Sequence, residues 1–429
     1  MDYSSPSSRQ RVNIITHIHT DASSAETSVL NDRIGAAIRR CAGKGSPVSW
    51  AECFTPITRL ESLVQHGRGG HGPVHMILVT DHMRGQSHRL PSRHLAAAAR
   101  TPRLALGAEL ATRTRDIDGR YQTGPEILAF GPPHLVEGPH GPYYGLSQRL
   151  IDELYDTCLD DDRRELCTRR ARDLLLARGV AHALSHPLDG HALSLEGTLG
   201  IISEFAFTET INGGYSARSA RMLEAFIRLN NALVGGAELP EAALSPVGRR
   251  IVGHILRHGR IVHALSGSDA HSHDFDRAVT AMPAPEGRLP EEVAPGDLFD
   301  RMLALTRRRE AALPASPLVT LGRTATLRSL LSDVSAIILR NVRSNLRHTL
   351  NPITWTNIAV TTLYITQDEL RRQGRIQRRR LRQMERDFNP ERLAPLLAAQ
   401  PAAVTPGPRR IVQLRPRSRQ ARFAARAGQ

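Results

Sequence analysis

The chain has 429 residues, a hydrophobic fraction of 40% and a net charge of +15, so it is long and apolar enough for one large domain with an appendage. Its four cysteines are scattered and form no CxxC pair, which argues against a disulfide framework and a thiolate zinc knuckle. The first ten residues contain no apolar stretch, and no apolar run reaches the length of a bilayer span, so we expect a cytoplasmic protein with no secretory signal and no membrane span.

Seven short aliphatic runs lie beside residues of the types that bind metal ions. In chain order they are residues 12–15 before His17 and His19, 76–79 before Asp81 and His82, 104–106 before Glu109, 127–130 after Glu126, 180–184 before His186, 205–207 before Glu209, and 261–265 before Asp269 and His271. Catalytic groups of βα barrels lie at the carboxyl ends of the strands, so this series predicts a parallel barrel whose strand ends meet at one site. Imidazoles and carboxylates without thiolates suit two or three borderline or hard divalent ions.

Helical patterns alternate with these runs. The clearest of them cover residues 150–178, 216–233 and 246–258. Alternation of strand and helix predicts an α/β fold with a parallel sheet. Residues 23–75 are too many for a simple connection, so we interpret them as an elaborated first crossover with a helix at 31–41.

The predicted barrel ends near residue 280, which gives a first domain of residues 1–280. Residues 281–296 are rich in Pro and Gly and are typical of a linker. Residues 297–392 contain amphipathic helical patterns and form a predicted basic, mostly helical extension. Residues 393–429 are rich in Ala, Pro and Arg, and we expect a disordered tail there.

The positive charge is concentrated in the last third of the chain. Residues 301–429 hold 25 Arg, no Lys and 7 acidic residues, a net charge of +18, and residues 1–300 have a net charge of −3. Such asymmetry predicts that the C-terminal region binds nucleic acid or another polyanion. Solubility or contact with a partner protein is the alternative, because Lys44 is the only lysine and the composition is biased towards Arg throughout.

Each metal-ligand motif is weak when it is taken alone. His17 and His19 alternate along a predicted strand, so both point to one face and can bind one ion; the alternative is a pair of ordinary surface or core histidines. Asp269 and His271 repeat this spacing at the last run. Glu109 lies between apolar residues, where a bridging metal ion would offset the cost of its burial and a salt bridge to an arginine is the alternative.

The motifs gain specificity from their order. HxHTD, VTDH, GAE, SHP, ETxNG and GSDAH follow one another along the chain, and as a series they resemble the PHP (polymerase and histidinol phosphatase) superfamily of metal-dependent phosphoesterases. The resemblance covers about residues 11–275 and leaves the last third of the chain outside it. It implies a distorted seven-stranded (β/α)7 barrel that holds two or three divalent metal ions, namely zinc, manganese or iron.

The resemblance also implies a distribution of ligands. It places His17, His19, Glu109 and Asp269 on one metal ion. Glu109 would bridge to a second ion, which His186 would also bind.

Further residues have implied roles at the same site. His82 and His271 would bind the third ion, and Asp81 would either orient His82 or add a ligand. From its position two residues past His82, and apart from the resemblance, Arg84 is a candidate clamp for a phosphate group, with a surface arginine as the alternative. Glu209, with Asn212 of the ETxNG segment, is expected either to support the ligands or contact substrate, with a structural role as the alternative.

Two departures from the family pattern stand out. The acidic residue or histidine that commonly follows the HxH motif is replaced by HTDASS, so that only Asp21 is nearby. Glu126 stands where the family commonly has a histidine. Glu126 can bind the same ion, but it adds negative charge and favours a harder metal such as Mn²⁺.

We therefore expect a metal-dependent phosphoesterase that hydrolyses a phosphate ester with a metal-activated water, with Asp81, Glu209 and Arg84 as the residues nearest the chemistry. The basic C-terminal region favours a nucleic-acid or nucleotide substrate, although aromatic residues for base stacking make up only 4% of the chain. A small-molecule phosphatase of the histidinol-phosphatase type is the alternative. A further alternative is a catalytically silent scaffold with a polyanion-binding tail.

Overall fold

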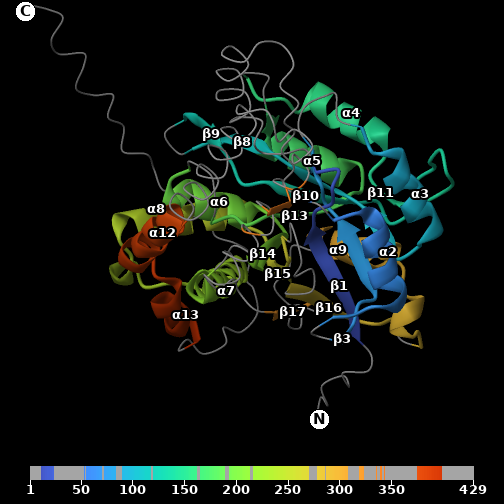
Figure 1. Ribbon diagram of the computed structural model, residues 1–429. Helices are drawn as coiled ribbons and strands as arrows, with labels where there is room; N and C mark the ends of the chain where they lie inside the picture. Colours follow the sequence, from blue (N-terminus) through green and yellow to red (C-terminus); the bar gives the residue numbers. More distant parts are fainter. Residues whose placement is uncertain are drawn as a thin grey trace, which may run out of the picture.

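The structure is a computed structural model, and part of the chain is described in it. The described residues are 11–23, 53, 55–69, 72–83, 89–116, 119–161, 165–188, 193–212, 216–269, 278–285, 287–307, 318–322, 335, 339–340, 343 and 374–398. In this part the protein is a mixed α/β fold with two six-stranded sheets and helices packed around them (Figure 1). None of its helices is long and apolar enough to cross a membrane.

The first sheet contains the strand that opens the HxH motif. Its strand order is β11 (Tyr144–Gly145), β6 (Leu104–Leu106), β4 (Met76–Val79), β1 (Arg11–Ile18), β16 (Ala278–Pro283) and β17 (Val319–Gly322). The first four strands in this order pair in parallel, whereas β16 is antiparallel to β1 and to β17. β1 is buried from its second residue onward, as a strand covered on both faces should be.

The second sheet carries most of the other predicted strand ends. Its strand order is β15 (His263–Ser266), β14 (Phe207–Ile211), β13 (Ala181–Leu184), β10 (Ile127–Gly131), β7 (Ala108–Leu110) and β5 (His82–Met83). Six of the seven aliphatic runs lie wholly or largely in strands, whereas the run 205–207 ends where β14 begins, so that Glu209 lies inside β14. The expected parallel direction is wrong for β10, which is antiparallel to both β13 and β7. This reversal explains why Glu126 precedes its strand. The amino end of β10 lies at the same edge as the carboxyl ends of its neighbours.

Two chain segments pass from one sheet to the other. β4 continues into β5, and β6 continues into β7 through Gly107, whose amide donates to the carbonyl of Val79. A Cβ atom on Gly107 would lie 2.4 Å from the carbonyl oxygen of Ala129, so only glycine permits this approach. At the far edge, the hydroxyl of Thr16 in β1 donates to the carbonyl of Ser266 in β15. No sheet closes on itself among the described strands.

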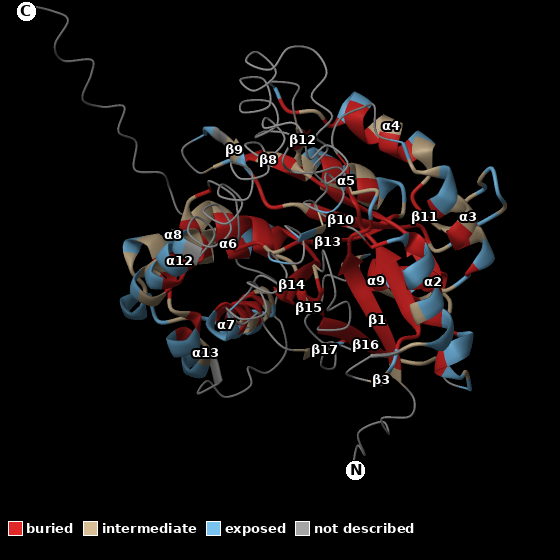
Figure 2. Cartoon of the chain, in the orientation of Figure 1, coloured by how far each residue is buried: buried red, intermediate tan, exposed pale blue. Residues whose placement is uncertain are grey.

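Helices cover both sheets. α2 (Ile57–His66) and α3 (Ser92–Arg100) pack on the first sheet, and α9 (Pro295–Arg307) packs on apolar residues that both sheets direct inward. The helices on the second sheet are α4 (Gln148–Thr157), α5 (Thr168–Ala177), α6 (Leu195–Glu204), α7 (Ala217–Val234) and α8 (Pro246–His258). Figure 2 shows their buried sides turned towards the strands.

The expected helices at 216–233 and 246–258 are confirmed as α7 and α8. The single helix expected at 150–178 is wrong, because this segment forms α4 and α5 with β12 (Leu166–Cys167) between them. β12 pairs with β8 (Thr112–Arg115), which also pairs with β9 (Tyr121–Thr123). At least one acidic residue of this segment pairs with the small sheet and not with a neighbour along a helix: Asp160 Oδ2 lies 2.9 Å from Nη1 of Arg113 in β8.

The C-terminal segments pack into the same body. The expected linker at 281–296 includes the end of β16, a 3-10 turn (Pro290–Glu292) and the start of α9. α12 (Gly374–Asp387) and α13 (Pro390–Ala398) bury Leu381, Met384, Phe388 and Leu393 in the cluster shared with α6, α7 and α8. α13 extends six residues past 392, where the tail was expected to begin. The predicted helix at 31–41 and residues 399–429 lie outside the described residues.

An ion-pair network joins α5, α6 and α8, and it yields a prediction about stability. Glu204 is buried and accepts from Arg169 at 2.7 Å, Arg172 at 2.8 Å and His254 at 3.0 Å. Burial alone would raise the pKa of Glu204, but His254 and the two guanidinium groups hold that pKa well below its usual value. Glu204→Gln should lower the free energy of unfolding by about 3 kcal/mol, because it removes the buried carboxylate that Arg169, Arg172 and His254 share and leaves Arg172 only the exposed Asp173 as a counter-charge. Urea denaturation measures this loss.

Glu153→Gln is the matched control, because Glu153 pairs with the exposed Arg178 at the protein surface. Its loss should be much smaller. Equal losses in the two variants would show that the Glu204 network is no stronger than a surface pair.

Candidate metal centre

A local irregularity in β1 directs both histidines of the HxH motif to the interior. Ile15 and Ile18 both pack against α2 and α3, although strict alternation would place them on opposite faces. The pairing of β1 with β4 shifts register between these two residues. This shift turns His17 and His19 towards the inward face that Val12 and Ile14 also occupy.

His17, His19 and Asp269 form one group that could hold a metal ion, and Glu109 lies beside both histidines. His17 Nε2 lies 3.1 Å from His19 Nε2, 3.2 Å from Glu109 Oε2 and 3.6 Å from Asp269 Oδ1. His19 Nε2 lies 3.3 Å from Glu109 Oε2 and 3.2 Å from Asp269 Oδ1. Ligands on a tetrahedral zinc ion with bonds of about 2.1 Å stand about 3.4 Å apart. The separations therefore fit a divalent metal ion.

Glu109 is the central residue of the site. Its Oε2 atom faces His17 and His19, whereas its Oε1 atom lies 3.0 Å from His186 Nε2. His186 Nε2 also lies 3.3 Å from Glu126 Oε2, so Glu109, Glu126 and His186 form a second group that could hold an ion. The two oxygens of one carboxylate thus face two separate ligand groups. Glu126 occupies a ligand position from the amino end of β10.

A third group is formed by His19, His82 and Glu109. His82 Nδ1 lies 3.2 Å from Glu109 Oε2, and the His82 and His19 rings stack with centroids 4.4 Å apart. His271, the expected partner of His82, lies outside the described residues, as does Arg84.

Glu209 lies behind the ligands. Its Oε1 atom is 2.9 Å from His17 Nδ1, and its Oε2 atom accepts from the His186 amide at 3.1 Å and from Asn212 Nδ2 at 3.0 Å. A carboxylate on one imidazole nitrogen leaves the other nitrogen as the metal ligand, so Glu209 orients His17. Glu209 is fully buried and lies in none of the three metal-binding groups.

Ser185 was not identified by the sequence analysis. Its hydroxyl donates to Glu109 Oε1 at 2.8 Å and also lies 3.3 Å from Glu209 Oε2, so it links the central carboxylate to the one behind it. Its position directly before His186 in the SHP motif was the available signal.

Asp81 does not join the ligand groups. Its two oxygens accept from the backbone amide and the hydroxyl of Thr20, at 2.5 and 2.7 Å, and Oδ2 lies 3.7 Å from His94 Nδ1. Asp81 therefore fixes the turn that follows β1. Burial raises the pKa of Asp81, and the hydrogen bonds from Thr20 only partly oppose this.

The carboxylates change the protonation of the histidines. Burial lowers the pKa of His17, but Glu209, Glu109 and Asp269 outweigh it and raise that pKa well above the usual value. Burial likewise lowers the pKa of His19, but the hydrogen bonds that His19 donates to Asp269 and Glu109 outweigh it and raise that pKa to about 9. Without a metal ion, the imidazoles of His17 and His19 therefore tend to be protonated. A divalent ion in the same place would supply the positive charge and displace these protons.

Two further histidines beside the motifs are core residues. His182 in β13 donates from Nδ1 to the Val180 carbonyl at 2.8 Å and packs against Phe205, and His263 in β15 packs against Phe207. Burial lowers the pKa of each to about 4, with only weak opposing effects at His182. Both are therefore neutral and lie outside the ligand groups.

These features define a class: a mixed α/β protein with a buried cluster of histidines and carboxylates that fits divalent metal ions. No protein-family model matches the chain, and a search of the curated proteins finds no match.

The raised histidine pKa yields a prediction about pH. The folded pKa of His19 is about 9 and the ordinary value is 6.5, so its charged form stabilises the metal-free fold below pH 6.5 and this contribution is lost as pH rises through about 9. In the presence of a chelator, the Tm of the wild type should fall more steeply over this window than the Tm of His19→Gln. Differential scanning fluorimetry from pH 6 to about pH 9.5 measures the two slopes.

The control is His66→Gln, because His66 is exposed on α2. It should keep the wild-type slope. Equal slopes for wild type and His19→Gln would contradict the raised pKa.

Proposed function

We propose that the protein is a metal-dependent phosphoesterase of the PHP type with a di- or trinuclear centre of zinc, manganese or iron, acting on nucleic acid or nucleotides. The observation that carries this proposal is Glu109, whose Oε2 atom faces His17 and His19 while its Oε1 atom faces His186. A carboxylate placed in this way is suited to bridge two ions, and paired ions are a common solution for phosphate ester hydrolysis.

The proposed barrel is supported by the connections between the sheets. β4 continues into β5, β6 continues into β7, and Thr16 joins β1 to Ser266 of β15 at the opposite edge. The strand ends of both sheets thereby meet around one interior. We interpret this as a distorted (β/α)7 barrel.

When bound, the ions would polarise the phosphoryl oxygens and lower the pKa of a bound water. The candidate ligands differ in how far they are exposed to solvent. His17, His19 and Glu109 have side chains with no exposed surface, whereas those of Asp269, His186 and Glu126 are 19%, 17% and 14% exposed. The substrate phosphate is therefore expected to approach from the side of these three partly exposed ligands. Glu209 keeps the Nδ1 proton of His17, so that the Nε2 lone pair stays available.

The cysteine beside this centre is not suited to act as a nucleophile. Cys53 is the nearest described thiol, and its Sγ atom donates to the His19 carbonyl at 3.1 Å. Burial raises the pKa of Cys53 to about 12, and the opposing effect of Thr55 is small. The thiol therefore stays protonated and is a poor nucleophile at neutral pH.

The test combines metal analysis with turnover. Protein purified without chelator should contain two or three divalent ions per chain by mass spectrometry, and it should hydrolyse an aryl phosphate and labelled single-stranded DNA in the presence of Mn²⁺. His17→Ala and Asp269→Ala should abolish turnover and keep the fold, whereas His66→Ala on the surface should retain both.

The outcomes separate the three functions. Preference for DNA supports the proposed substrate. Hydrolysis of small phosphates alone favours the small-molecule phosphatase, to which the basic C-terminal region gives no support. No bound metal and no turnover would leave the silent scaffold.

A further inference from the structure

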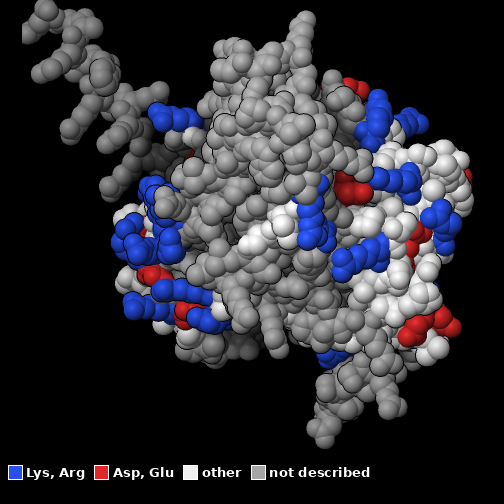
Figure 3. Space-filling view, viewed as in Figure 1, with Lys and Arg blue, Asp and Glu red and all other residues white. Residues whose placement is uncertain are grey.

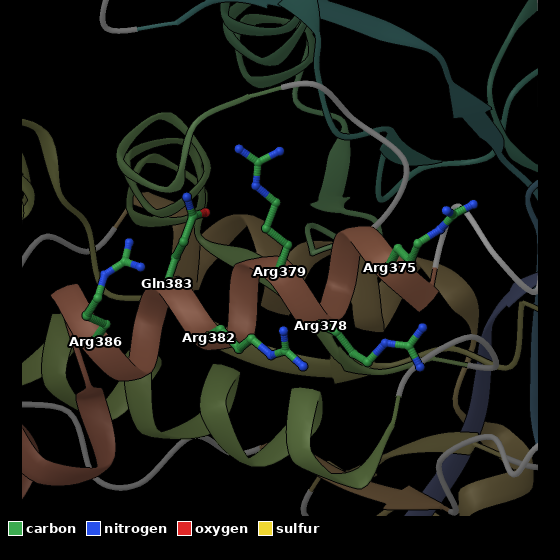
Figure 4. A pocket seen from close by; sticks show the side chains of 6 residues that line it. All are labelled: Arg375, Arg378, Arg379, Arg382, Gln383 and Arg386. Carbon is green, nitrogen blue, oxygen red and sulfur yellow. The ribbon is translucent and has the colours of Figure 1, made fainter.

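α12 presents a row of arginines on one side. Arg375, Arg378, Arg379, Arg382 and Arg386 are exposed and, together with Gln383, line a shallow pocket on the surface; we call these five the arginine ridge (Figure 4). Their spacing of three, four, seven and eleven residues from the first places them on one helix face. Figure 3 shows Lys and Arg side chains gathered over this end of the molecule.

The charge of the ridge is only partly balanced within the protein. Glu385 pairs with Arg218 on α7, and Asp387 accepts from Arg386 at 2.7 Å. Arg378, Arg379 and Arg382 have no carboxylate partner in the described part of the chain. Like charges three and four residues apart on a helix repel each other, so a bound anion would reduce this electrostatic repulsion.

The opposite face of α12 is firmly attached. Leu381 and Met384 are buried against α6, α7 and α8, and Arg380 is 4% exposed and donates from Nη1 to the Leu188 carbonyl at 2.6 Å. Leu188 lies two residues after the proposed metal ligand His186. The helix that carries the ridge is therefore fixed directly to the loop that leaves the metal centre.

From this arrangement we infer that the arginine ridge binds the phosphate backbone of single-stranded nucleic acid and holds the substrate of the proposed phosphoesterase, on whose activity the inference rests. The ridge spans eleven residues, about 16 Å along the helix axis. It is therefore long enough to contact several consecutive phosphates of one strand. Guanidinium binds phosphate through two parallel hydrogen bonds.

The chemistry of the ridge also sets its selectivity. No aromatic side chain belongs to the arginine face of α12, since Phe388 is buried on the opposite side against Phe226. Bases therefore have no platform for stacking, and binding should depend on phosphate charge and little on base sequence.

The experiment measures binding of a fluorescein-labelled 20-nucleotide oligo-dT by anisotropy, in chelator and over a series of salt concentrations. The test variant is Arg378→Gln/Arg379→Gln/Arg382→Gln. The matched control removes the same charge elsewhere: Arg59→Gln/Arg103→Gln/Arg149→Gln, on α2, before β6 and on α4. A third protein with lysine at positions 378, 379 and 382 keeps the charge.

The ridge variant should bind at least tenfold more weakly. Its slope of log affinity against log salt should be shallower by about 2, because each lost phosphate contact on a single strand contributes about 0.7. The matched control and the lysine variant should keep most of the affinity and the slope. Wild-type affinity in the ridge variant would overturn the inference, as would equally strong competition by poly-glutamate, which would indicate an acidic protein partner.

Turnover separates this inference from the proposed function. The ridge variant should hydrolyse an aryl phosphate at the wild-type rate, because none of its three positions lies at the metal centre. Loss of oligonucleotide binding with intact hydrolysis supports both proposals. Ridge-dependent binding without any metal-dependent hydrolysis would remove the phosphoesterase and leave the nucleic-acid surface.

Discussion

Replacing Glu109 with glutamine should remove at least one bound metal ion and lower metal-dependent turnover by about a thousandfold. The amide keeps the size of the side chain but loses the charge that faces His17, His82 and His186. Burial raises the pKa of Glu109, yet His17 and His82 hold that pKa well below its usual value, so the native residue is ionised. Metal ions supply several kcal/mol of transition-state stabilisation, and each 1.36 kcal/mol corresponds to about a factor of ten in rate.

Metal content by mass spectrometry and aryl phosphate hydrolysis measure this effect. Glu137→Gln is the matched control, because Glu137 is exposed in a loop away from the ligand groups. It should leave both quantities unchanged. A Glu109→Gln protein with its full complement of ions and wild-type turnover would exclude the bridging role.

The convergence of the candidate ligands could be predicted because strand ends have a strong local signal. His17, His186 and Asp269 each follow a short aliphatic run, and the structure brings them to one place with Glu109. Glu126 was a departure from the expected histidine, and it too lies in a ligand group. The residue types and their order were sufficient to predict these candidate ligands, because their position at strand ends follows from the local sequence once the direction of each strand is known.

Strand direction and strand partners could not be predicted. The reversal of β10 depends on which strands flank it, and nothing in the sequence of Ile127–Gly131 distinguishes the two directions. β16 begins where the barrel was expected to end and β17 lies within the predicted helical extension, although both extend the sheet next to β1. Pairing partners far apart in the chain leave no local pattern.

The roles of the carboxylates were the hardest part of the site. Asp81 and His82 are neighbours in the DH motif, but their side chains point to opposite sides of the strand, so Asp81 binds Thr20 while His82 faces Glu109. Glu209 lies on β14 behind His17, where it acts through another residue. Sequence spacing identifies which residues are polar at a strand end, but side-chain contacts across strands decide which of them join the candidate ligand groups.

Gly267, the first residue of the GSDAH motif, provides a test of how Glu209 positions His17. A Cβ atom on Gly267 would lie 1.9 Å from Glu209 Oε1 and 2.6 Å from His17 Cβ. Glu209 cannot move away cheaply, because His17, the His186 amide and Asn212 all hold its carboxylate. Gly267→Ala should therefore turn His17 out of position, weaken metal binding by about ten- to a hundredfold, and lower the free energy of unfolding by about 1 to 3 kcal/mol.

The matched control is Gly253→Ala in the middle of α8, where a Cβ atom would meet nothing within 4 Å. This variant should keep its metal affinity and gain up to about 1 kcal/mol of stability, since alanine favours the helix. Isothermal titration with Mn²⁺ and urea denaturation measure both quantities for the two variants. Wild-type metal affinity in Gly267→Ala would show that the contact of Glu209 with His17 does not position the ligand, whereas a selective loss would establish that the close approach of β15 to β1 is part of the metal centre.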